Sequence, residues 1–347
     1  MPAPLAERPL VVLSPGFDDA RRAALEDAAP IVELLDAADP SFDVRFVDAD
    51  GWIGKPTDAQ LARCERLRWI QSPTASLEHF LTPALVAHPS TLTNCRGLFG
   101  DVIAEHVFGY LLSMSRNLHH YRDRQRERRY EAVRDERGDG DAPPQTPDFA
   151  TGPAFVLPPD RVHHRLQDWS LLIVGVGGIG AAIATRAAAW GIRVAGVDPQ
   201  RRRLSGVLPT IDPPQRLPEC IGRFDVVIIA APLTAQTRGL FDRDLIGCMK
   251  PGSRLINVGR GPIVSTDAVV EALQSGHLAG VGLDVVEEEP LPPDHPLWDC
   301  PNAILTPHVA ACSPVIAERH LRLIVDNLRR FAEGRPLRNV VDKTAGF

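Results

Sequence analysis

Three charged side chains, Arg260, Glu289 and His308, each follow the end of a predicted strand. The three apolar segments predicted as strands span residues 255–258, 280–284 and 303–306. Because ligands of parallel sheets bind beyond the carboxyl ends of the strands, we expect these side chains to share one crevice. An arginine offers a fork of donors to a carboxylate, and a histidine beside a carboxylate can exchange a proton near neutral pH. This set suits the reduction of a 2-oxo acid, which needs an anion clamp, a proton donor and a hydride.

Each of the three residues also has a purely structural interpretation. Arg260 stands between two glycines and could cap a turn. Glu289 ends a run of acidic residues that could simply face water, and His308 follows a proline and could be a packed loop histidine. The residues alone leave these alternatives open.

A glycine-rich turn is the expected binding site for the hydride donor. An apolar segment runs into Gly175, Gly177 and Gly180, which have the G-x-G-x-x-G spacing of a dinucleotide-binding turn. The first glycine permits the turn, the second lets the backbone approach a pyrophosphate, and the third lets the following helix pack close to the strand. Such turns also occur as structural loops, but here a helix, a second strand and then Asp198 follow in order. That order favours a dinucleotide site.

The acidic residue also bears on which dinucleotide is bound. Asp198 is placed to accept a hydrogen bond from the ribose of NAD and would repel the 2′-phosphate of NADP. Arg201, Arg202 and Arg203 follow closely and could attract that phosphate. Since the carboxylate is at the ribose and the arginines lie further along the chain, we expect NAD, with NADP as the less favoured cofactor.

Composition excludes several classes of protein. The 347 residues are 44% hydrophobic and 24% charged, and no apolar run approaches the ~18 residues of a membrane span. The net charge of -6 offers no basic field for nucleic acid. No signal peptide is evident, so we expect a cytoplasmic protein without membrane or nucleic-acid partners. The six cysteines are scattered without metal-ligand spacing, which argues against zinc and against disulfides.

Strands and helices alternate along the chain, which predicts an α/β fold with parallel sheets. In the first hundred residues we predict strands at 9–14, 43–47, 67–71 and 90–94, and helices at 18–28, 57–66 and 77–87. A long helix from Asp101 to about residue 129 should link two domains, and the proline-rich segment at about 130–165 should be an irregular insertion. A six-stranded doubly wound sheet and a final helix at 314–331 follow.

Five motifs together resemble the NAD-dependent D-2-hydroxyacid dehydrogenase family, over most of the chain from about Leu67 to Val341. They are Gly-Val-Gly-Gly-Ile-Gly at 175–180, Ala-Pro-Leu-Thr at 231–234 with Thr-Arg-Gly at 237–239, the segments 255–261 and 282–290, and Leu-Thr-Pro-His at 305–308. The resemblance implies two Rossmann-like domains. A doubly wound NAD-binding domain (101–306) would be inserted into a smaller flavodoxin-like substrate domain (1–100 and 307–347).

The resemblance also assigns roles to residues. It implies that Arg260 binds and polarises the substrate, that Glu289 orients and charges His308, that His308 transfers the proton, and that Asp284 contacts the nicotinamide. The implied cofactor-binding residues are Gly175, Gly177, Gly178, Ile179, Gly180, Asp198, Ala231, Pro232, Thr237, Val258, Gly259 and Asp284. The implied substrate loop is Thr74, Ala75 and Ser76, in which Ser76 replaces a usual glycine and adds a side chain where backbone N–H groups meet the substrate carboxylate.

The expected activity is therefore hydride transfer between NAD(H) and a small 2-oxo acid and its D-2-hydroxy acid, of the glyoxylate/hydroxypyruvate, D-lactate or D-glycerate type. A formate dehydrogenase is disfavoured, because there an amide takes the place of Glu289. An NAD-sensing scaffold of the same fold, like the family's co-repressors, is the alternative from another class. We also expect a homodimer built on the cofactor domain, because the helix from Asp101 and the arm after it are too exposed for a monomer.

Overall fold

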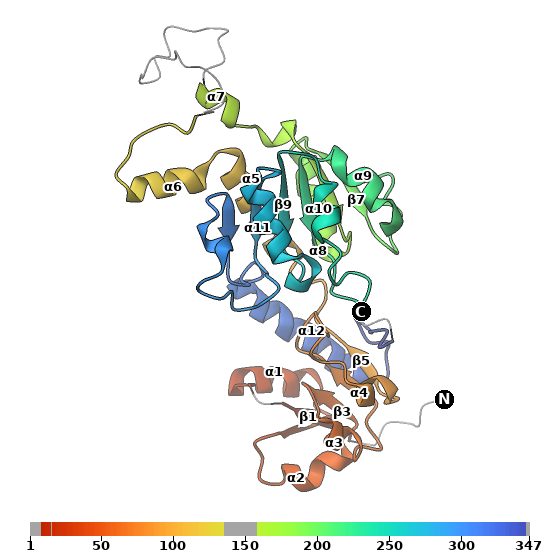
Figure 1. Ribbon diagram of the computed structural model, residues 1–347. Coiled ribbons are helices and arrows are strands. Elements are labelled where there is room, and N and C mark those ends of the chain that lie inside the picture. The colour runs from red at the N-terminus through yellow and green to blue at the C-terminus, as the bar shows by residue number, and fades with distance from the viewer. Residues whose placement is uncertain (1–7, 15, 135–157, 345–347) are drawn as a thin grey trace. The chain divides into compact units, whose positions relative to one another are not determined.

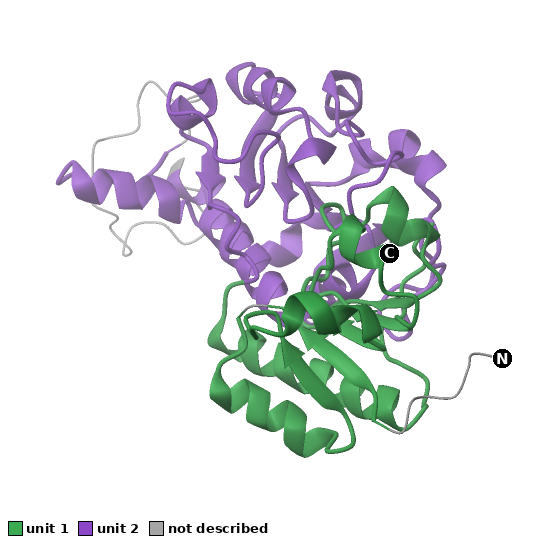
Figure 2. Ribbon diagram, turned by 90° about the horizontal axis from the view of Figure 1, so that it is seen from below, with its two compact units in different colours: residues 1–99, 312–347 green, residues 100–311 purple. Residues whose placement is uncertain are grey.

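The structure is a computed structural model that describes residues 8–14, 16–134 and 158–344 (Figure 1). The chain divides into two compact units, one of residues 1–99 and 312–347 and the other of residues 100–311 (Figure 2). Both are built on parallel sheets covered by helices, so the predicted α/β class is confirmed. No helix in the described part of the chain combines the length and the apolar character that a bilayer span requires.

The smaller unit has a five-stranded parallel sheet in the flavodoxin-like order β2-β1-β3-β4-β5. The strands are β1 (Leu10–Leu13), β2 (Glu33–Asp36), β3 (Gly51–Ile53), β4 (Trp69–Gln71) and β5 (Thr91–Thr93). Helices α1 (Asp19–Ala28) and α12 (Pro314–Ala332) cover one face, where the rings of Trp69 and Phe331 pack at a tilt with centroids 5.1 Å apart. On the other face the short helices α2 (Phe42–Arg45), α3 (Asp58–Leu61) and α4 (Pro83–Ala87) enclose a core around Trp52.

The larger unit has a six-stranded parallel sheet in the order β11-β10-β9-β8-β6-β7. Its strands are β6 (Ser170–Val174), β7 (Arg193–Val197), β8 (Val226–Ile229), β9 (Ser253–Asn257), β10 (Leu278–Leu283) and β11 (Ala303–Leu305). The strand order reverses between β6 and β8, and ligands of such sheets bind beyond the strand ends at this point. The glycine-rich turn after β6 therefore lies where the topology places a ligand.

Helices cover both faces of the larger sheet. Alternate residues such as Leu172 and Val281 join the core beneath α9 (Leu217–Cys220), α10 (Arg243–Gly247) and α11 (Thr266–Gln274). Their neighbours Ile173 and Gly282 face helices α8 (Gly178–Ala189) and α5 (Gly100–Ser115), which pack side by side. The remaining helices are α6 (Leu118–Arg126) and α7 (Pro158–Val162).

Several predicted elements of the smaller unit are wrong. Residues 43–47 alternate polar and apolar types like a strand, yet they form α2 and a following 3₁₀ turn. The reason is that Phe42 and Phe46 stack one helical turn apart, with ring centroids at 5.3 Å. Strands β2 and β3 escaped prediction because β2 begins and ends with an acidic residue and β3 begins with glycine, residue types that are depleted in strands. The predicted helix at 77–87 begins only at Pro83, where the Thr82 side chain caps its first turn.

The predicted linking helix is interrupted. Helix α5 ends at Ser115, Asn117 adopts a left-handed conformation with φ of 53°, and α6 begins at Leu118. Of the predicted insertion at about 130–165, residues 135–157 lie outside the described part of the chain. Residues 158–162, expected to be irregular, form the short helix α7.

Candidate active site

The glycine-rich turn joins β6 to α8 and has little room for side chains. A Cβ atom on Gly180 would lie 2.0 Å from the carbonyl oxygen of Gly175, and one on Gly175 would lie 2.7 Å from the backbone of Ala231. Gly177 caps α8 without a side-chain hydrogen bond, and a Cβ atom there would enter open space. The first amides of α8 are thus available to an anion such as a pyrophosphate, which the helix dipole favours.

Asp198 fixes the conformation of this turn. One carboxylate oxygen accepts from the backbone N–H of Val176 at 2.9 Å, and the other accepts from Gln200 and Arg201 at 2.8 and 2.7 Å. The Arg202 guanidinium folds back onto the carbonyl oxygen of Asp198 at 2.9 Å. The negative charge is therefore held at the end of β7, beside the glycine-rich turn.

The loops after β8 and β9 meet next to the turn. A Cβ atom on Gly259 would lie 2.7 Å from the Ala231 carbonyl oxygen, so the two loops can approach this closely only with glycine there. Thr237 donates to the carbonyl of Pro232 at 2.7 Å and so closes its own loop. Val258 is buried and donates its backbone N–H to Ile229.

Glu289 and His308 form the central contact of the site. The Nδ1 atom of His308 lies 2.8 Å from Oε2 of Glu289, and Oε1 of Glu289 accepts from the backbone N–H of Val286 at 3.2 Å. Because Nδ1 is occupied by the carboxylate, Nε2 is the ring nitrogen left for proton exchange. The His308 side chain is 51% exposed, so a substrate and water can both reach it.

The neighbouring acidic residue has a different role. Glu287 accepts from the backbone N–H of Thr266 at 2.5 Å and donates its own backbone N–H to the Thr266 hydroxyl at 3.4 Å. These bonds cap the first turn of α11. Within the acidic run, Glu287 therefore holds a helix while Glu289 holds the histidine.

The loop that carries Arg260 is held by hydrogen bonds with the Asn257 side chain. Asn257, at the end of β9, donates to the carbonyl of Arg260 and accepts from the N–H of Gly259, both at 3.0 Å. A Cβ atom on Gly261 would lie 1.7 Å from the carbonyl oxygen of Val286, so the arginine loop packs directly on the segment that leads to Glu289. The larger unit thus brings together the loops of all three predicted catalytic residues.

Asp284 is buried beneath the histidine. Its side chain accepts from Thr306, Val309 and Ala310, and its backbone carbonyl accepts from the N–H of His308 at 2.8 Å. Inspection of the sequence missed Thr306 and two residues of α5, His106 and Tyr110, that contact it. The spacing of four between the two α5 residues is the only signal that they share a helix face.

The substrate loop predicted at Thr74, Ala75 and Ser76 follows β4 in the smaller unit. The Thr74 hydroxyl donates to the Ser76 carbonyl at 2.6 Å, and the Ser76 hydroxyl donates to Glu78 at 2.7 Å. The Ser76 side chain is therefore engaged within its own loop. Its role toward a substrate stays a prediction.

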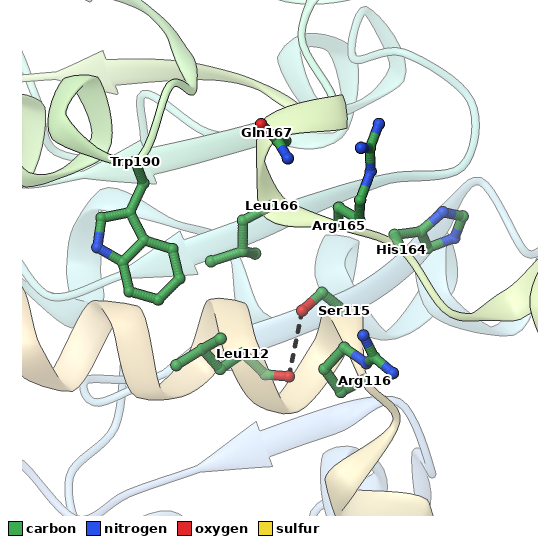
Figure 3. Close-up of a pocket in the computed structure, with 8 residues that line it drawn as sticks. All are labelled: Leu112, Ser115, Arg116, His164, Arg165, Leu166, Gln167 and Trp190. Atoms are coloured by element: carbon green, nitrogen blue, oxygen red, sulfur yellow. Dashed lines mark hydrogen bonds between the residues drawn. The ribbon is translucent and has the colours of Figure 1, made fainter.

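A cavity of about 250 Å³ in the larger unit lies away from these residues (Figure 3). It is formed by the last turn of α5, the segment before β6 and the end of α8. Its lining residues are Leu112, Ser115, Arg116, His164, Arg165, Leu166, Gln167 and Trp190. Since β6 begins beside it, the cavity is at the amino-terminal edge of the sheet, opposite the candidate active site.

The chain is similar to known proteins in sequence and in fold. Residues 108–310 match the family described as "D-isomer specific 2-hydroxyacid dehydrogenase, NAD binding domain". A glyoxylate reductase from Thermofilum pendens is 31% identical over 278 residues, which are 80% of this chain and 75% of that protein. The structure of a D-isomer specific 2-hydroxyacid dehydrogenase family protein from Aeromonas salmonicida has 31% identity and a TM-score of 0.74, and the match covers 97% of this chain and 100% of that chain.

A third relative was solved with ligands. An NADPH-dependent glyoxylate/hydroxypyruvate reductase from Sinorhizobium meliloti, in complex with NADP and sulfate, is 27% identical with a TM-score of 0.73. The match covers 98% of this chain and 100% of that chain. These similarities confirm the family resemblance that the five motifs indicated.

Proposed function

The chain belongs to the D-isomer specific 2-hydroxyacid dehydrogenase family of oxidoreductases, and from this premise we propose that it interconverts a small 2-oxo acid and its D-2-hydroxy acid with NAD(H). The contact between Glu289 and His308 at 2.8 Å carries the proposal. The relatives named glyoxylate reductase and glyoxylate/hydroxypyruvate reductase make glyoxylate and hydroxypyruvate the first substrates to test, ahead of the oxo acids related to D-lactate and D-glycerate.

The residues divide the chemistry of oxo-acid reduction between them. When bound, the dinucleotide supplies the hydride. Arg260 binds the substrate carboxylate and polarises the carbonyl, and Nε2 of His308 gives its proton to the carbonyl oxygen as the carbonyl carbon is reduced. Glu289 keeps the ring oriented through Nδ1 and stabilises the imidazolium before the transfer. The exposed ring is then reprotonated from water.

The cofactor site fits a dinucleotide, and we propose NAD in preference to NADP. The open space beside Gly177 and the free amides of α8 suit a pyrophosphate. The Asp198 carboxylate, fixed by three backbone N–H groups, places a negative charge where a 2′-phosphate would have to lie. We assign Ala231, Pro232, Thr237, Val258 and Gly259 to the walls of this site, since their loops adjoin the turn.

A screen of 2-oxo acids with NADH and NADPH tests the function. We expect NADH to be consumed with glyoxylate or hydroxypyruvate, and chiral analysis of a larger substrate's product to give the D enantiomer. His308→Gln is the matched control that keeps a polar side chain without the acid. Tight dinucleotide binding without turnover of any 2-oxo acid would contradict the proposal and favour an NAD-sensing scaffold.

We further propose that the protein is a cytoplasmic homodimer joined through the larger unit. Leu118, Tyr130 and Trp190 of this unit are each more than half exposed, and Trp190 also lines the cavity of Figure 3. A second copy would cover such apolar surface. The six cysteines are free thiols in the structure, a state that a reducing compartment maintains. Sedimentation showing only a 37.9 kDa species at micromolar concentration would contradict the dimer.

A further inference from the structure

We propose that Thr306, supported by Tyr110 and His106 of helix α5, is a positioning residue that sets the backbone of the His308 loop through Asp284. The inference rests on the proposed function, because it concerns the group that would transfer the proton. The side chains of Thr306, Tyr110, His106 and Asp284 all lie in the larger unit. Of these, Thr306, Tyr110 and His106 do not reach the reacting atoms in our proposed mechanism.

Asp284 accepts hydrogen bonds from three successive backbone N–H groups of the His308 loop. The N–H of His308 donates to the backbone carbonyl oxygen of Asp284 at 2.8 Å. The N–H groups of Val309 and Ala310 donate to the carboxylate oxygens Oδ1 and Oδ2 of Asp284, at 2.9 and 3.0 Å. The side chain is 4% exposed, so these bonds are shielded from water. Hydrogen bonds to a buried carboxylate are strong, and they hold the loop in one conformation.

That conformation needs support. His308 has φ of 55°, in the left-handed region that a residue with a Cβ atom rarely adopts. Such a backbone persists only where the surrounding structure holds it, and strained residues of this kind are found at active sites. The amides donated to Asp284 supply that restraint on both sides of the His308 Cα atom.

The Thr306 hydroxyl links Asp284 to helix α5. It lies 2.6 Å from Oδ1 of Asp284 and 3.0 Å from Nε2 of His106, and it also contacts the Tyr110 hydroxyl. A carboxylate only accepts, so the single Thr306 proton goes to Asp284. The two remaining lone pairs must then accept from Tyr110 and from His106, which fixes the proton of the His106 ring on Nε2. Burial raises the pKa of Tyr110, so its hydroxyl keeps this proton across the working range.

The helix is fitted closely to the strand at this point. Tyr110 is 3% exposed, and its ring occupies the space where a Cβ atom on Gly282 would lie only 2.7 Å away. The His106 ring meets the Tyr110 ring edge to face at 4.8 Å and 89°. Glycine in β10 thus lets α5 place two donors on one hydroxyl. The consequence is a continuous hydrogen-bonded path from the helix to the catalytic loop.

Thr306→Val tests the hydroxyl with almost unchanged volume, Thr306→Ser restores it, and Tyr110→Phe removes one supporting donor. We expect Thr306→Val to lower kcat for oxo-acid reduction roughly 10-fold and Tyr110→Phe a few-fold, because small displacements of a catalytic group are costly. The KM for NADH should stay near wild type, and Thr306→Ser should recover most of the kcat. The melting temperature of Thr306→Val should fall by a few degrees, because the buried Asp284 and Tyr110 lose a hydrogen-bond partner. Equal kcat in Thr306→Val, a loss that serine does not restore, or an effect confined to the KM for NADH would overturn the proposal.

A second readout separates this proposal from the proposed function. In protein with isotope-labelled histidines, the His308 signal, identified by its absence from His308→Gln, reports the ring's surroundings without turnover. We expect Thr306→Val to shift this signal and Thr306→Ser to leave it near wild type. If the wild-type protein reduces no 2-oxo acid, the proposed function fails while this measurement still decides the positioning role. An unmoved signal in Thr306→Val would overturn the positioning role even in an active enzyme.

Discussion

The Glu289 carboxylate and the His308 imidazole meet at 2.8 Å, although each belongs to a different loop. A nearby carboxylate favours the protonated ring, which is the form that oxo-acid reduction consumes. We expect Glu289→Gln to lower kcat for oxo-acid reduction at least about tenfold, because the amide can still hold the ring but carries no charge to offset the imidazolium. Binding of NADH should be unchanged. The matched control is Glu288→Gln, in the same exposed acidic run, and an unchanged kcat in Glu289→Gln would show that the pair is only structural.

The fixed position of the Asp198 carboxylate beside the glycine-rich turn should set cofactor choice. We expect wild-type protein to have a higher kcat/KM with NADH than with NADPH. Asp198→Ser removes the charge and should narrow that ratio, with each tenfold change corresponding to ~1.4 kcal/mol. Steady-state kinetics with both cofactors provide the measurement, and an NADPH preference in the wild type would contradict the assignment of NAD.

The sequence was most informative where a residue type is required by close packing or by charge. The glycine spacing at 175–180 correctly predicted the tight turn between β6 and α8. The turn requires glycine, because a Cβ atom on Gly180 would clash with the backbone. Strand β3 was missed, since it begins with glycine, a residue type that is depleted in strands. The α2 segment was misassigned because stacking of Phe42 on Phe46 outweighs its alternating pattern.

The same contrast holds for the candidate site. Glu289 and His308 could be expected in one crevice because both follow strand ends, which parallel topology brings to one edge, and the family resemblance implied their pairing. Thr306 and Tyr110 could not, since their contact joins residues 196 positions apart through the packing of a helix on Gly282. No local pattern encodes that pairing. The motifs also assigned Asp284 only to the cofactor, whereas the described hydrogen bonds of its side chain are to the histidine loop and Thr306.

Substitutions at two glycines of the turn should affect the melting temperature and NADH binding differently. Gly177→Ala adds a methyl group to open space at φ of -74°, so the protein should melt near the wild-type temperature. The methyl group would nevertheless intrude where we place the pyrophosphate, and NADH binding should weaken at least about tenfold. Gly180→Ala, which forces a Cβ atom against Gly175, should lower the melting temperature as well. Unchanged NADH affinity in Gly177→Ala would contradict the placement of the dinucleotide.

Partly buried histidines should make the larger unit sensitive to mild acid. Burial is the main cause that lowers the pKa of His119 to about 4, and the protonated His120 beside it lowers it further. Burial likewise lowers the pKa of His120 and His164. An unfolded histidine titrates near ~6.5, so between that pH and about 4 the unfolded chain binds more protons than the folded one. The stabilisation by neutral His119 is therefore complete above the unfolded pKa and is lost as the pH falls through this window.

Replacing His119 with a residue that does not titrate isolates the contribution of His119 to this loss of stability in acid. The His119 ring lies 3.2 Å from the Ser113 carbonyl through Nδ1, and the amide of His119→Gln can still donate to that oxygen. Urea unfolding at about pH 7, 6 and 5 should show the wild type losing more free energy of unfolding than the variant, by up to about 1 kcal/mol after allowance for partial exposure. His79→Gln, at an exposed position, is the control and should follow the wild type. If His119→Gln loses stability as steeply as the wild type over this range, then His119 already takes up its proton in the folded protein.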